Sequence, residues 1–286
     1  MINFIFIQLT LGQQPPKLND YPYFYSSNEF YAKNLINPGY TGQNNQHEFQ
    51  LSSFGQWFGP INGLSNYSFL YNGCFEKINS GLGLKIDMES YGNIDKRHEI
   101  SGFYSYKILS SSNIGITLGT KLGFTSRKII NDVVMIGEKT IIGSGNWINS
   151  PIIDLGVIMK YDKFNFGIAY KNLIENKIQF LNYETILYSK GFTIDATYAF
   201  ELNDKFFLKP YFIDYYYNLN SFSFGIVTEI NDNLLAGFGY ETYYKKFDAT
   251  LAIKMFKHFQ FGYIFEMNKD YGYSGLMLKF IIKPSS

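Results

Sequence analysis

The chain has 286 residues, of which 19% are aromatic and only 17% are charged, and its formal net charge is +1. A water-soluble domain usually carries more charge and fewer aromatic rings, and the scattered lysines and arginines form no basic cluster of the kind that nucleic acid requires. The single cysteine, Cys74, excludes an internal disulfide and a cysteine-based metal cluster.

The N-terminus opens with a short apolar run, MINFIFIQLTLG, which ends at Gly12 before the polar residues Gln13 to Pro16. Such a run with a small residue at its end is typical of a signal peptide, although the positive charge that usually precedes it is missing. We therefore predict a signal peptide over residues 1–12, with a buried N-terminal strand as the alternative. No other stretch contains about 18 consecutive apolar residues, so any membrane crossing would use strands.

Most of the chain alternates between apolar and small or polar residues with the period of a β-strand. Between residues 113 and 125, Ile114, Ile116 and Leu118 alternate with Gly115 and Thr117. Many such segments run for about 9 to 13 residues, which is long for a globular strand and sufficient to cross a bilayer at a tilt. Aromatic residues gather at segment ends, where an interfacial girdle would lie; they include Tyr215, Tyr216, Tyr217, Tyr243, Tyr244, Tyr271 and Tyr273. The sequence therefore predicts an all-β protein, a transmembrane antiparallel up-and-down β-barrel.

About fourteen such segments can be counted, an even number that suits a closed single-chain barrel. The predicted strands cover 48–57, 64–75, 80–89, 97–108, 113–126, 151–160, 163–171, 190–201, 205–215, 220–230, 233–241, 246–255, 258–267 and 274–283. One set of connections consists of tight turns, and the other includes long loops over 127–150 and 172–189. Because outer-membrane barrels have short periplasmic turns, we expect a periplasmic N-terminus. Pro210 lies within a predicted strand and predicts a bulge or a register break.

Residues with catalytic or metal-binding chemistry are sparse. The stretch Arg97-His98-Glu99-Ile100 begins like a zinc-binding His-Glu-x-x-His helix, but Gly102 stands where the second histidine belongs and the segment alternates like a strand. The Gly-x-Gly pairs at 81–83 and 237–239 fall within alternating runs, which places their glycines on the lumen face rather than in a phosphate loop. We therefore predict no catalytic residue, no metal site, no cofactor and no enzyme activity.

Three short motifs follow one another in the first 125 residues. The stretch from Asn34 to Gly42 reads NLINPGYTG, the strand after it ends in Gln56-Trp57, and a Gly-Leu-Gly follows at 81–83. The chain resembles the PorP/SprF family, whose members typically show an NPAYAG-like element, an RxQW element and a GLG strand. Two positions depart from that pattern, since Gly39 replaces the usual alanine and Phe54 stands where the family generally has arginine. The residues that carry the resemblance are Asn37, Pro38, Gly39, Tyr40, Gly42, Gln56, Trp57, Gly81 and Gly83.

The resemblance implies an outer-membrane component of the type IX secretion and gliding machinery of Bacteroidota. It implies that the barrel supports export or surface attachment of large adhesins, with their C-terminal domains, other type IX secretion components and membrane lipid as partners. The alternative is a passive or substrate-specific outer-membrane channel. In that case polar lumen residues would set selectivity, among them Lys85, Asp87, Lys121, Asp195, Glu229 and Lys254.

An N-terminal segment over residues 13–46 precedes the barrel, which we expect over residues 47–286. In one interpretation Asn37-Pro38-Gly39 is a turn that leads into the first strand, with proline presetting φ and glycine tolerating a positive φ. In the other, residues 30–42 fold back so that Tyr31, Leu35, Ile36 and Tyr40 pack on or in the periplasmic mouth, because wide barrels are commonly plugged.

The two long loops supply candidate partner contacts. Trp147 lies among glycine and asparagine residues, where it is either an exposed anchor or a member of the outer interfacial belt. Phe180 and Tyr183 belong to a loop more apolar than solvation favours, so that loop either covers the barrel mouth or meets a partner.

Overall fold

The computed structural model describes residues 32–58, 64–91, 95–111, 113–129, 134–136, 139–141, 147–180, 183–188, 190–216, 220–231, 233–256, 258–268 and 272–283. The predicted signal peptide and Tyr31 lie outside these residues. No helix in the described part of the chain is long and apolar enough to cross a membrane.

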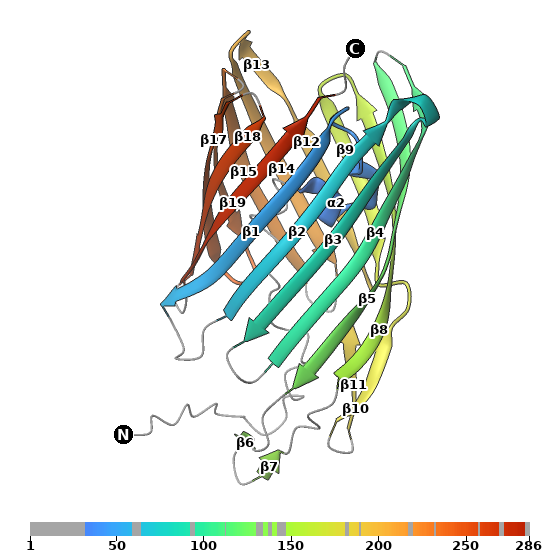
Figure 1. Ribbon diagram of the computed structural model, residues 1–286, viewed down its shortest axis with the longest axis vertical. Helices are drawn as coiled ribbons and strands as arrows, with labels where there is room; N and C mark the ends of the chain where they lie inside the picture. Colours follow the sequence, from blue (N-terminus) through green and yellow to red (C-terminus); the bar gives the residue numbers. More distant parts are fainter. Residues whose placement is uncertain are drawn as a thin grey trace.

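Fourteen antiparallel strands form a closed barrel (Figure 1). They are β1 (His47–Phe58), β2 (Leu64–Phe75), β3 (Ser80–Tyr91), β4 (Asp95–Ser110), β5 (Ile114–Ile129), β8 (Trp147–Tyr161), β9 (Phe164–Lys171), β12 (Gly191–Tyr198), β14 (Phe206–Tyr216), β15 (Asn220–Ile230), β16 (Leu234–Glu241), β17 (Lys246–Met255), β18 (Phe259–Met267) and β19 (Gly272–Ile282). Because β1 pairs with β19 and β12 pairs with β14, the sheet closes on itself. The predicted all-β antiparallel barrel is confirmed, and the largest boundary difference is at β8, predicted from 151 and observed from Trp147.

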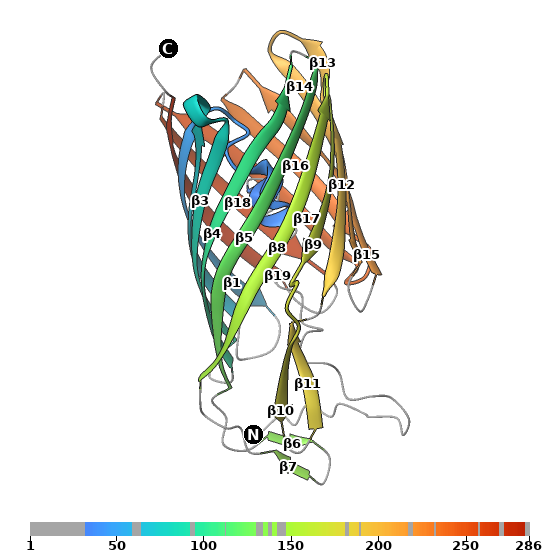
Figure 2. The same cartoon turned by 90° about the vertical axis from the view of Figure 1, so that its right-hand side faces the viewer.

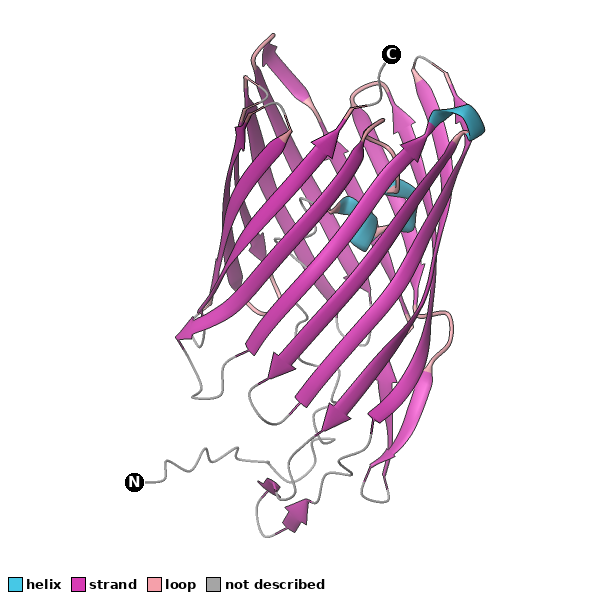
Figure 3. Ribbon diagram, in the orientation of Figure 1, coloured by secondary structure: helices cyan, strands magenta, loops and turns pink. Residues whose placement is uncertain are grey.

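The remaining elements are short. Strand β13 (Phe200–Asn203) continues β12 past a break, and two hairpins lie outside the barrel sheet, β6 (Val134–Ile136) with β7 (Lys139–Ile141) and β10 (Asn176–Phe180) with β11 (Tyr183–Tyr188). The helical elements are α2 (Lys33–Ile36), η1 (Pro38–Tyr40) and η2 (Glu76–Ile78). Figure 3 shows α2 and η1 within the barrel and η2 at its rim.

Alternation along each strand separates two faces of opposite character. In β8, Ile152, Asp154 and Ile158 point inward and are buried, whereas Leu155 and Val157 point outward and are exposed. The same period exposes apolar side chains on the other strands, up to 67% exposure for Leu276. An apolar outer face and a partly charged inner face are what a bilayer imposes on a barrel.

Aromatic pairs mark the two ends of the outer face. Near one end Phe259 lies 5.0 Å from Phe280, and Phe49 lies 5.0 Å from Tyr71, measured between ring centroids. Near the other end similar pairs join neighbouring strands, namely His98 with Trp147, Tyr170 with Phe192, Phe212 with Phe222, Tyr240 with Phe247, and Tyr243 with Tyr244. These two belts have the arrangement of the interfacial girdles of a membrane barrel.

The connections differ between the two ends. We name as the turn end the one that holds the short turns after β2, β4, β8, β13, β15 and β17, and as the loop end the one that holds β6–β7 and β10–β11 (Figure 2). Asn79, Asp162 and Asn231 adopt positive φ in the short turns, a conformation that asparagine and aspartate tolerate. Phe256 does so as well, with φ of 52° and 80% exposure.

Pro210 does not disturb its own strand in the way that we predicted. The pairing of β14 with β15 runs from Phe206 to Tyr216 without a register shift. On its other side β14 pairs with β13 as far as Leu208 and with β12 from Tyr211 onward. The break therefore lies in the neighbouring strand, opposite the residue that has no backbone N–H to donate.

Replacing an outward apolar residue with lysine tests the assignment of the two faces. We expect Leu251→Lys to lower the free energy of unfolding by about 2–4 kcal/mol, because a charged group would enter the lipid-facing band. The measurement is urea unfolding in lipid vesicles. Lys254→Gln, which removes a charge from the inward face of the same strand, is the control, and an equal effect of the two substitutions would contradict the assignment.

Candidate functional site

Residues Ala32–Gln46, which we name the plug, lie inside the barrel in the half next to the turn end (Figures 2 and 3). Asn34, Asn37 and Thr41 are at most 1% exposed, although each is polar. A buried polar segment must find hydrogen-bond partners within the protein. The inner wall of the barrel supplies most of them.

The Asn-Pro-Gly-Tyr motif has its own local structure. Asn37 caps η1, because its Oδ1 accepts a hydrogen bond of 2.9 Å from the backbone N–H of Gly39, and Pro38 takes the first helical position. Gly39 belongs to this helical turn and does not use the positive φ that glycine tolerates. The positive φ falls at Gly42, at 69°, where the chain turns toward β1.

Six wall strands hydrogen-bond to the plug. The bonds run from Lys171 Nζ to Leu35 O (2.7 Å), Asn37 Nδ2 to Val157 O (3.1 Å), Thr193 Oγ1 to Ile36 O (3.2 Å), Ser105 Oγ to Thr41 O (2.6 Å), Gly42 N to Asn72 Oδ1 (2.8 Å) and Gln43 Nε2 to Thr117 Oγ1 (2.9 Å). Four of these six end on a backbone atom of the plug. The wall therefore recognises the course of the plug backbone as well as its side chains.

Four inward glycines leave the space that the plug occupies. A Cβ atom on Gly119 would overlap the backbone of Pro38 and Gly39, and one on Gly81 would overlap the carbonyl group of Thr41. Cβ atoms on Gly156 and Gly167 would likewise press on the Asn37 side chain. Glycine at these positions lets one backbone approach another closely.

Tyr40 of the plug makes a polar contact with β12, and Lys33 lies beside its ring. The Tyr40 hydroxyl donates a short hydrogen bond to Asp195 of β12, and Lys33 Nζ lies 5.4 Å from the centre of the Tyr40 ring. Tyr40 itself lies in η1, outside the membrane-spanning strands. Burial, and then the Asp195 carboxylate, raise the pKa of its phenol, so the hydroxyl stays protonated and can donate.

Apolar contacts complete the seat of the plug. Ile36 packs in a buried cluster with Tyr211, Ile213 and Val227 of β14 and β15. A second cluster, in which Leu35 is partly buried, contains Ala32, Leu70 and Phe103. Leu35, Ile36 and Tyr40, which we expected to pack in the barrel mouth, thus contact its inner wall.

A network of buried charges lines the wall beside the plug. Glu99 on β4 has a fully buried side chain, and its carboxylate lies 2.8 Å from Lys121 Nζ, 3.0 Å from Arg97 Nη2 and 3.2 Å from Lys85 Nζ. A buried carboxylate is tolerated only with such compensation, and removal of one partner of a buried pair typically costs about 3–5 kcal/mol.

The network reaches the plug through two further residues. Asp154 lies 4.0 Å from Lys121 Nζ and 3.4 Å from Lys171 Nζ, and Lys171 also donates to the carbonyl of Leu35. Charges on five neighbouring strands are therefore linked to one backbone group of the plug.

The opposite side of the lumen holds an apolar cluster beside further buried ion pairs, such as Lys246 with Glu266 and Lys279 with Glu48. Phe54 is 2% exposed and packs with Ala252, Ile264 and Met277, and its ring occupies the space that a Cβ atom on Gly275 would need. This residue stands where the PorP/SprF family generally has arginine. In this chain the position contributes packing instead of charge.

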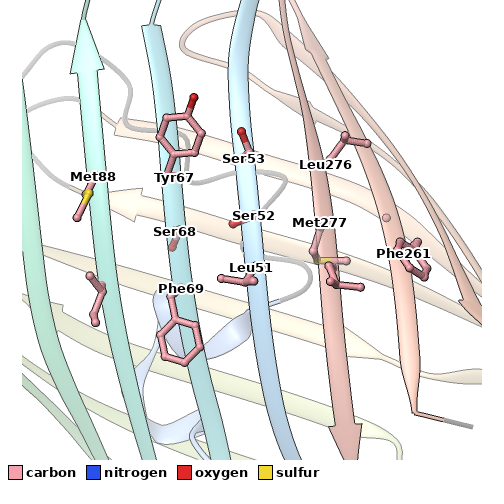
Figure 4. Close-up of a pocket in the computed structure, with 13 residues that line it drawn as sticks. Leu51, Ser52, Ser53, Tyr67, Ser68, Phe69, Met88, Phe261, Leu276 and Met277 are labelled. Carbon is pink, nitrogen blue, oxygen red and sulfur yellow. The ribbon is translucent and has the colours of Figure 1, made fainter.

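No group of three or more His, Cys, Asp or Glu residues in the described ranges could hold a metal ion. A groove on the outer face over β1–β3 and β18–β19 is lined mainly by apolar side chains, including Leu51, Tyr67, Met88 and Leu276 (Figure 4). Because it lies on the lipid-facing surface, the groove suits hydrocarbon rather than a polar substrate.

The structure brings together only part of the sequence motifs. Asn37, Pro38, Gly39, Tyr40, Gly42 and Gly81 belong to the plug or touch it. Gly83 faces the lumen two residues further along β3, beside Phe103. Gln56 lies near the loop end of β1, opposite Tyr273, and the Trp57 side chain lies outside the described residues.

The candidate partner contacts are all at the loop end. We expected Trp147 on a loop, but it begins β8. There it faces outward at 41% exposure, with its ring 4.7 Å from that of His98. Phe180 and Tyr183 are paired at the tip of β10–β11, and their side chains lie outside the described residues.

Sequence reasoning missed three of the four wall glycines. It also missed the role of Glu99, the carboxylate at the centre of the buried charge network. Gly119, Gly156 and Gly167 occupy inward positions on the neighbouring strands β5, β8 and β9. Inward glycines on three neighbouring strands could predict a close backbone approach, but only once the register between the strands is known. Glu99 was noted only as part of an incomplete zinc motif.

A family model described as "Type IX secretion system membrane protein PorP/SprF" matches residues 13–276. The chain belongs to this family. No curated protein matches its sequence. Membership of the PorP/SprF family makes the protein an outer-membrane component of type IX secretion, which implies interaction with other components of that system. The family and the fold are those of secretion or channel barrels and of no known enzyme class.

Solved outer-membrane barrels share the fold of this PorP/SprF protein. The outer membrane protein Omp33 of Acinetobacter baumannii is 10% identical with a TM-score of 0.54, over 82% of this chain and 98% of its own. The toluene transporter TodX of Pseudomonas putida is 10% identical with a TM-score of 0.55, over 92% and 95%. The toluene transporter TbuX of Ralstonia pickettii is 12% identical with a TM-score of 0.53, over 87% and 92%. At this identity the likeness shows the barrel fold alone.

A methyl group on the wall tests the seat of the plug. We expect Gly119→Ala to destabilise the seated plug by about 1–3 kcal/mol, because its Cβ would overlap the plug backbone. The measurement is maleimide labelling of a cysteine at position 32 in a Cys74→Ala background, and the labelling rate should rise about tenfold or more. Gly115→Ala is the control on the same strand and face, since its Cβ would lie 3.6 Å from its neighbours. Equal labelling of the two variants would contradict the proposed fit.

Two buried asparagines of the plug should respond differently to truncation. We expect Asn37→Ala to lower the free energy of unfolding by about 1–3 kcal/mol, because the Val157 carbonyl and the Gly39 N–H would lose their partner. Asn34 is equally buried, but its side-chain amide makes no hydrogen bond with the described residues. Asn34→Ala should therefore be neutral or stabilising in the same urea titration. A loss at Asn34 as large as that at Asn37 would contradict this account.

Proposed function

We propose that this protein supports the export or surface attachment of large adhesins in type IX secretion and gliding, through the C-terminal domains of those cargoes. Family membership supports the secretion role. The observation that carries the proposal is the seated plug, which lies inside the barrel next to the turn end. We propose that the plug closes the barrel, which would then act through its surfaces rather than by conducting solutes.

We further propose an orientation and a role for the motif. The turn end faces the periplasm, as short turns do in outer-membrane barrels, and the loop end faces outward. Asn37, Pro38, Gly39, Tyr40 and Gly42 then close the periplasmic half, with Gly81 as part of their seat. The remaining motif residues, Gln56, Trp57 and Gly83, then belong to the wall strands β1 and β3.

The loop end is the proposed side for cargo. Its β10–β11 hairpin carries Phe180 and Tyr183 at the tip, and Trp147 stands on the outer face nearby. Large aromatic residues of this kind dominate many binding interfaces. The outward position of Trp147 beside His98 equally suits the interfacial belt.

A passive or substrate-specific channel is the second candidate function. It is favoured by the fold likeness to two proteins described as toluene transporters. Among its proposed selectivity residues, Lys85 and Lys121 are committed to Glu99, and Asp195 to Tyr40. Residues paired in this way are less available to a permeating solute. We propose no catalytic activity for either function.

Comparative proteomics of the cell surface and culture medium, with and without the gene, tests the proposed function. We expect the deletion to remove one or a few large proteins from the surface while the general secretome stays intact, because a dedicated partner serves few cargoes. Complementation with the wild-type gene is the control. An unchanged surface and medium, together with impaired solute uptake, would favour the channel instead.

A further inference from the structure

The outer face of β3, β4, β5 and β8 changes in character toward the loop end. These four strands lie side by side (Figure 1), and their register aligns outward side chains in rows across all four. Arg97, Glu99, Thr125 and Arg127 are buried on the inner face, so the residues that alternate with them on β4 and β5 point outward.

Three consecutive rows can be followed from the loop end toward the middle of the barrel. We name them the rim row, the middle row and the apolar row. The rim row consists of Ser90, Lys96, Lys128 and Trp147, the middle row of Met88, His98, Ser126 and Asn149, and the apolar row of Ile86, Ile100, Phe124 and Pro151.

The rim row carries two lysines that stand directly opposite each other, Lys96 on β4 and Lys128 on β5. The Cβ atoms of opposed residues in an antiparallel pair lie about 4.5–5.5 Å apart, and like charges in that arrangement repel. An anion bound between the two ammonium groups would offset the repulsion and accept a charge-assisted hydrogen bond from each. The pair therefore favours a ligand with several anionic oxygens, such as a phosphate group.

The middle row lies two residues, or about 7 Å, nearer the middle of the barrel. Its Ser126 hydroxyl donates to Oδ1 of Asn149, and the His98 ring lies 4.7 Å from the Trp147 ring of the rim row. Hydroxyl, amide and imidazole groups beside an indole ring suit a sugar, which presents both hydroxyl groups and apolar C–H groups.

The apolar row begins the lipid-facing band. Phe124 is 64% exposed and Ile100 is 54% exposed, and both point away from the lumen. Side chains of this kind contact hydrocarbon in a membrane barrel. From rim to middle, this face thus presents cations, then polar groups and then apolar groups, over about 14 Å.

We propose that this face binds a phosphorylated glycolipid of the outer leaflet. Its phosphate lies between Lys96 and Lys128, its sugar contacts Trp147 and the middle row, and its acyl chains cover Ile100 and Phe124. Basic side chains at a membrane surface recognise lipid headgroups in this way. The inference rests on the proposed orientation, in which the loop end faces outward, and not on the adhesin role.

The arrangement favours a lipid over a free anion. A free anion needs only the two lysines, whereas the rows continue from the lysines into an exposed apolar face on the same strands. A lipid at the membrane surface has its phosphate, sugar and acyl chains in that same order. The site also gives Trp147 a second candidate ligand besides cargo.

Lipid A titrated into the purified barrel in detergent tests the proposal, with native mass spectrometry counting the bound lipid. We expect the double variant Lys96→Gln/Lys128→Gln to raise the apparent Kd about tenfold or more, because the phosphate loses both cations. Lys245→Gln is the matched control, since Lys245 is exposed on the turn after β16 at the same end, and it should leave the Kd unchanged. Heat-modifiable gel mobility verifies that each barrel is folded.

Two further ligands separate the lipid from a free anion. Dephosphorylated lipid A should bind the wild-type barrel about tenfold more weakly, and inorganic phosphate should not displace lipid A. Equal affinity of the double variant and the wild type, or equal binding of the two lipids, would overturn the site. Displacement by inorganic phosphate would make it an ordinary anion site and would overturn the lipid as its ligand.

The orientation has a separate test. A membrane-impermeant maleimide applied to whole cells should label Lys245→Cys in a Cys74→Ala background. Absence of labelling would overturn the orientation and the outer-leaflet ligand together, whereas labelling without lipid A binding would overturn the ligand site alone. The adhesin role is decided independently by the gene deletion.

Discussion

The close approach of two backbones inside the barrel is the contact on which the rest of the structure depends. At Gly119 the wall leaves no room for a Cβ atom beside Pro38 and Gly39, and Gly81 and Gly156 impose the same condition elsewhere on the plug. A barrel of fourteen strands is wide enough that wall side chains alone leave space inside. Glycine positions let the chain fill that space with its own N-terminal segment.

Both buried charges and apolar clusters line the lumen. On one side Glu99 gathers Lys85, Arg97 and Lys121, and the network continues through Asp154 to the plug. On the other side the wall is apolar around Phe54 and around Ile36 of the plug itself. The plug therefore contacts charged and apolar parts of the wall, and its own sequence, with polar Asn37 and apolar Ile36 adjacent, matches both.

Much of the fold could be predicted from the sequence because a membrane barrel repeats one simple pattern. A period of two assigns each residue to lipid or lumen, and asparagine and aspartate at Asn79, Asp162 and Asn231 mark the turns. The site was harder, because the register between strands decides which inward glycines meet. The position of Trp147 was missed, and the break predicted at Pro210 was assigned to the wrong strand, for the same reason, since both depend on where a neighbouring strand ends.

The central claim is that residues 32–46 close the lumen of a type IX secretion barrel. Single-channel conductance of the purified protein in planar bilayers, with and without residues 32–42, tests it most directly. The account predicts a closed wild-type barrel and a conducting barrel after the deletion, with both proteins folded by their gel mobility. Identical traces from the two proteins, whether both closed or both open, would contradict it.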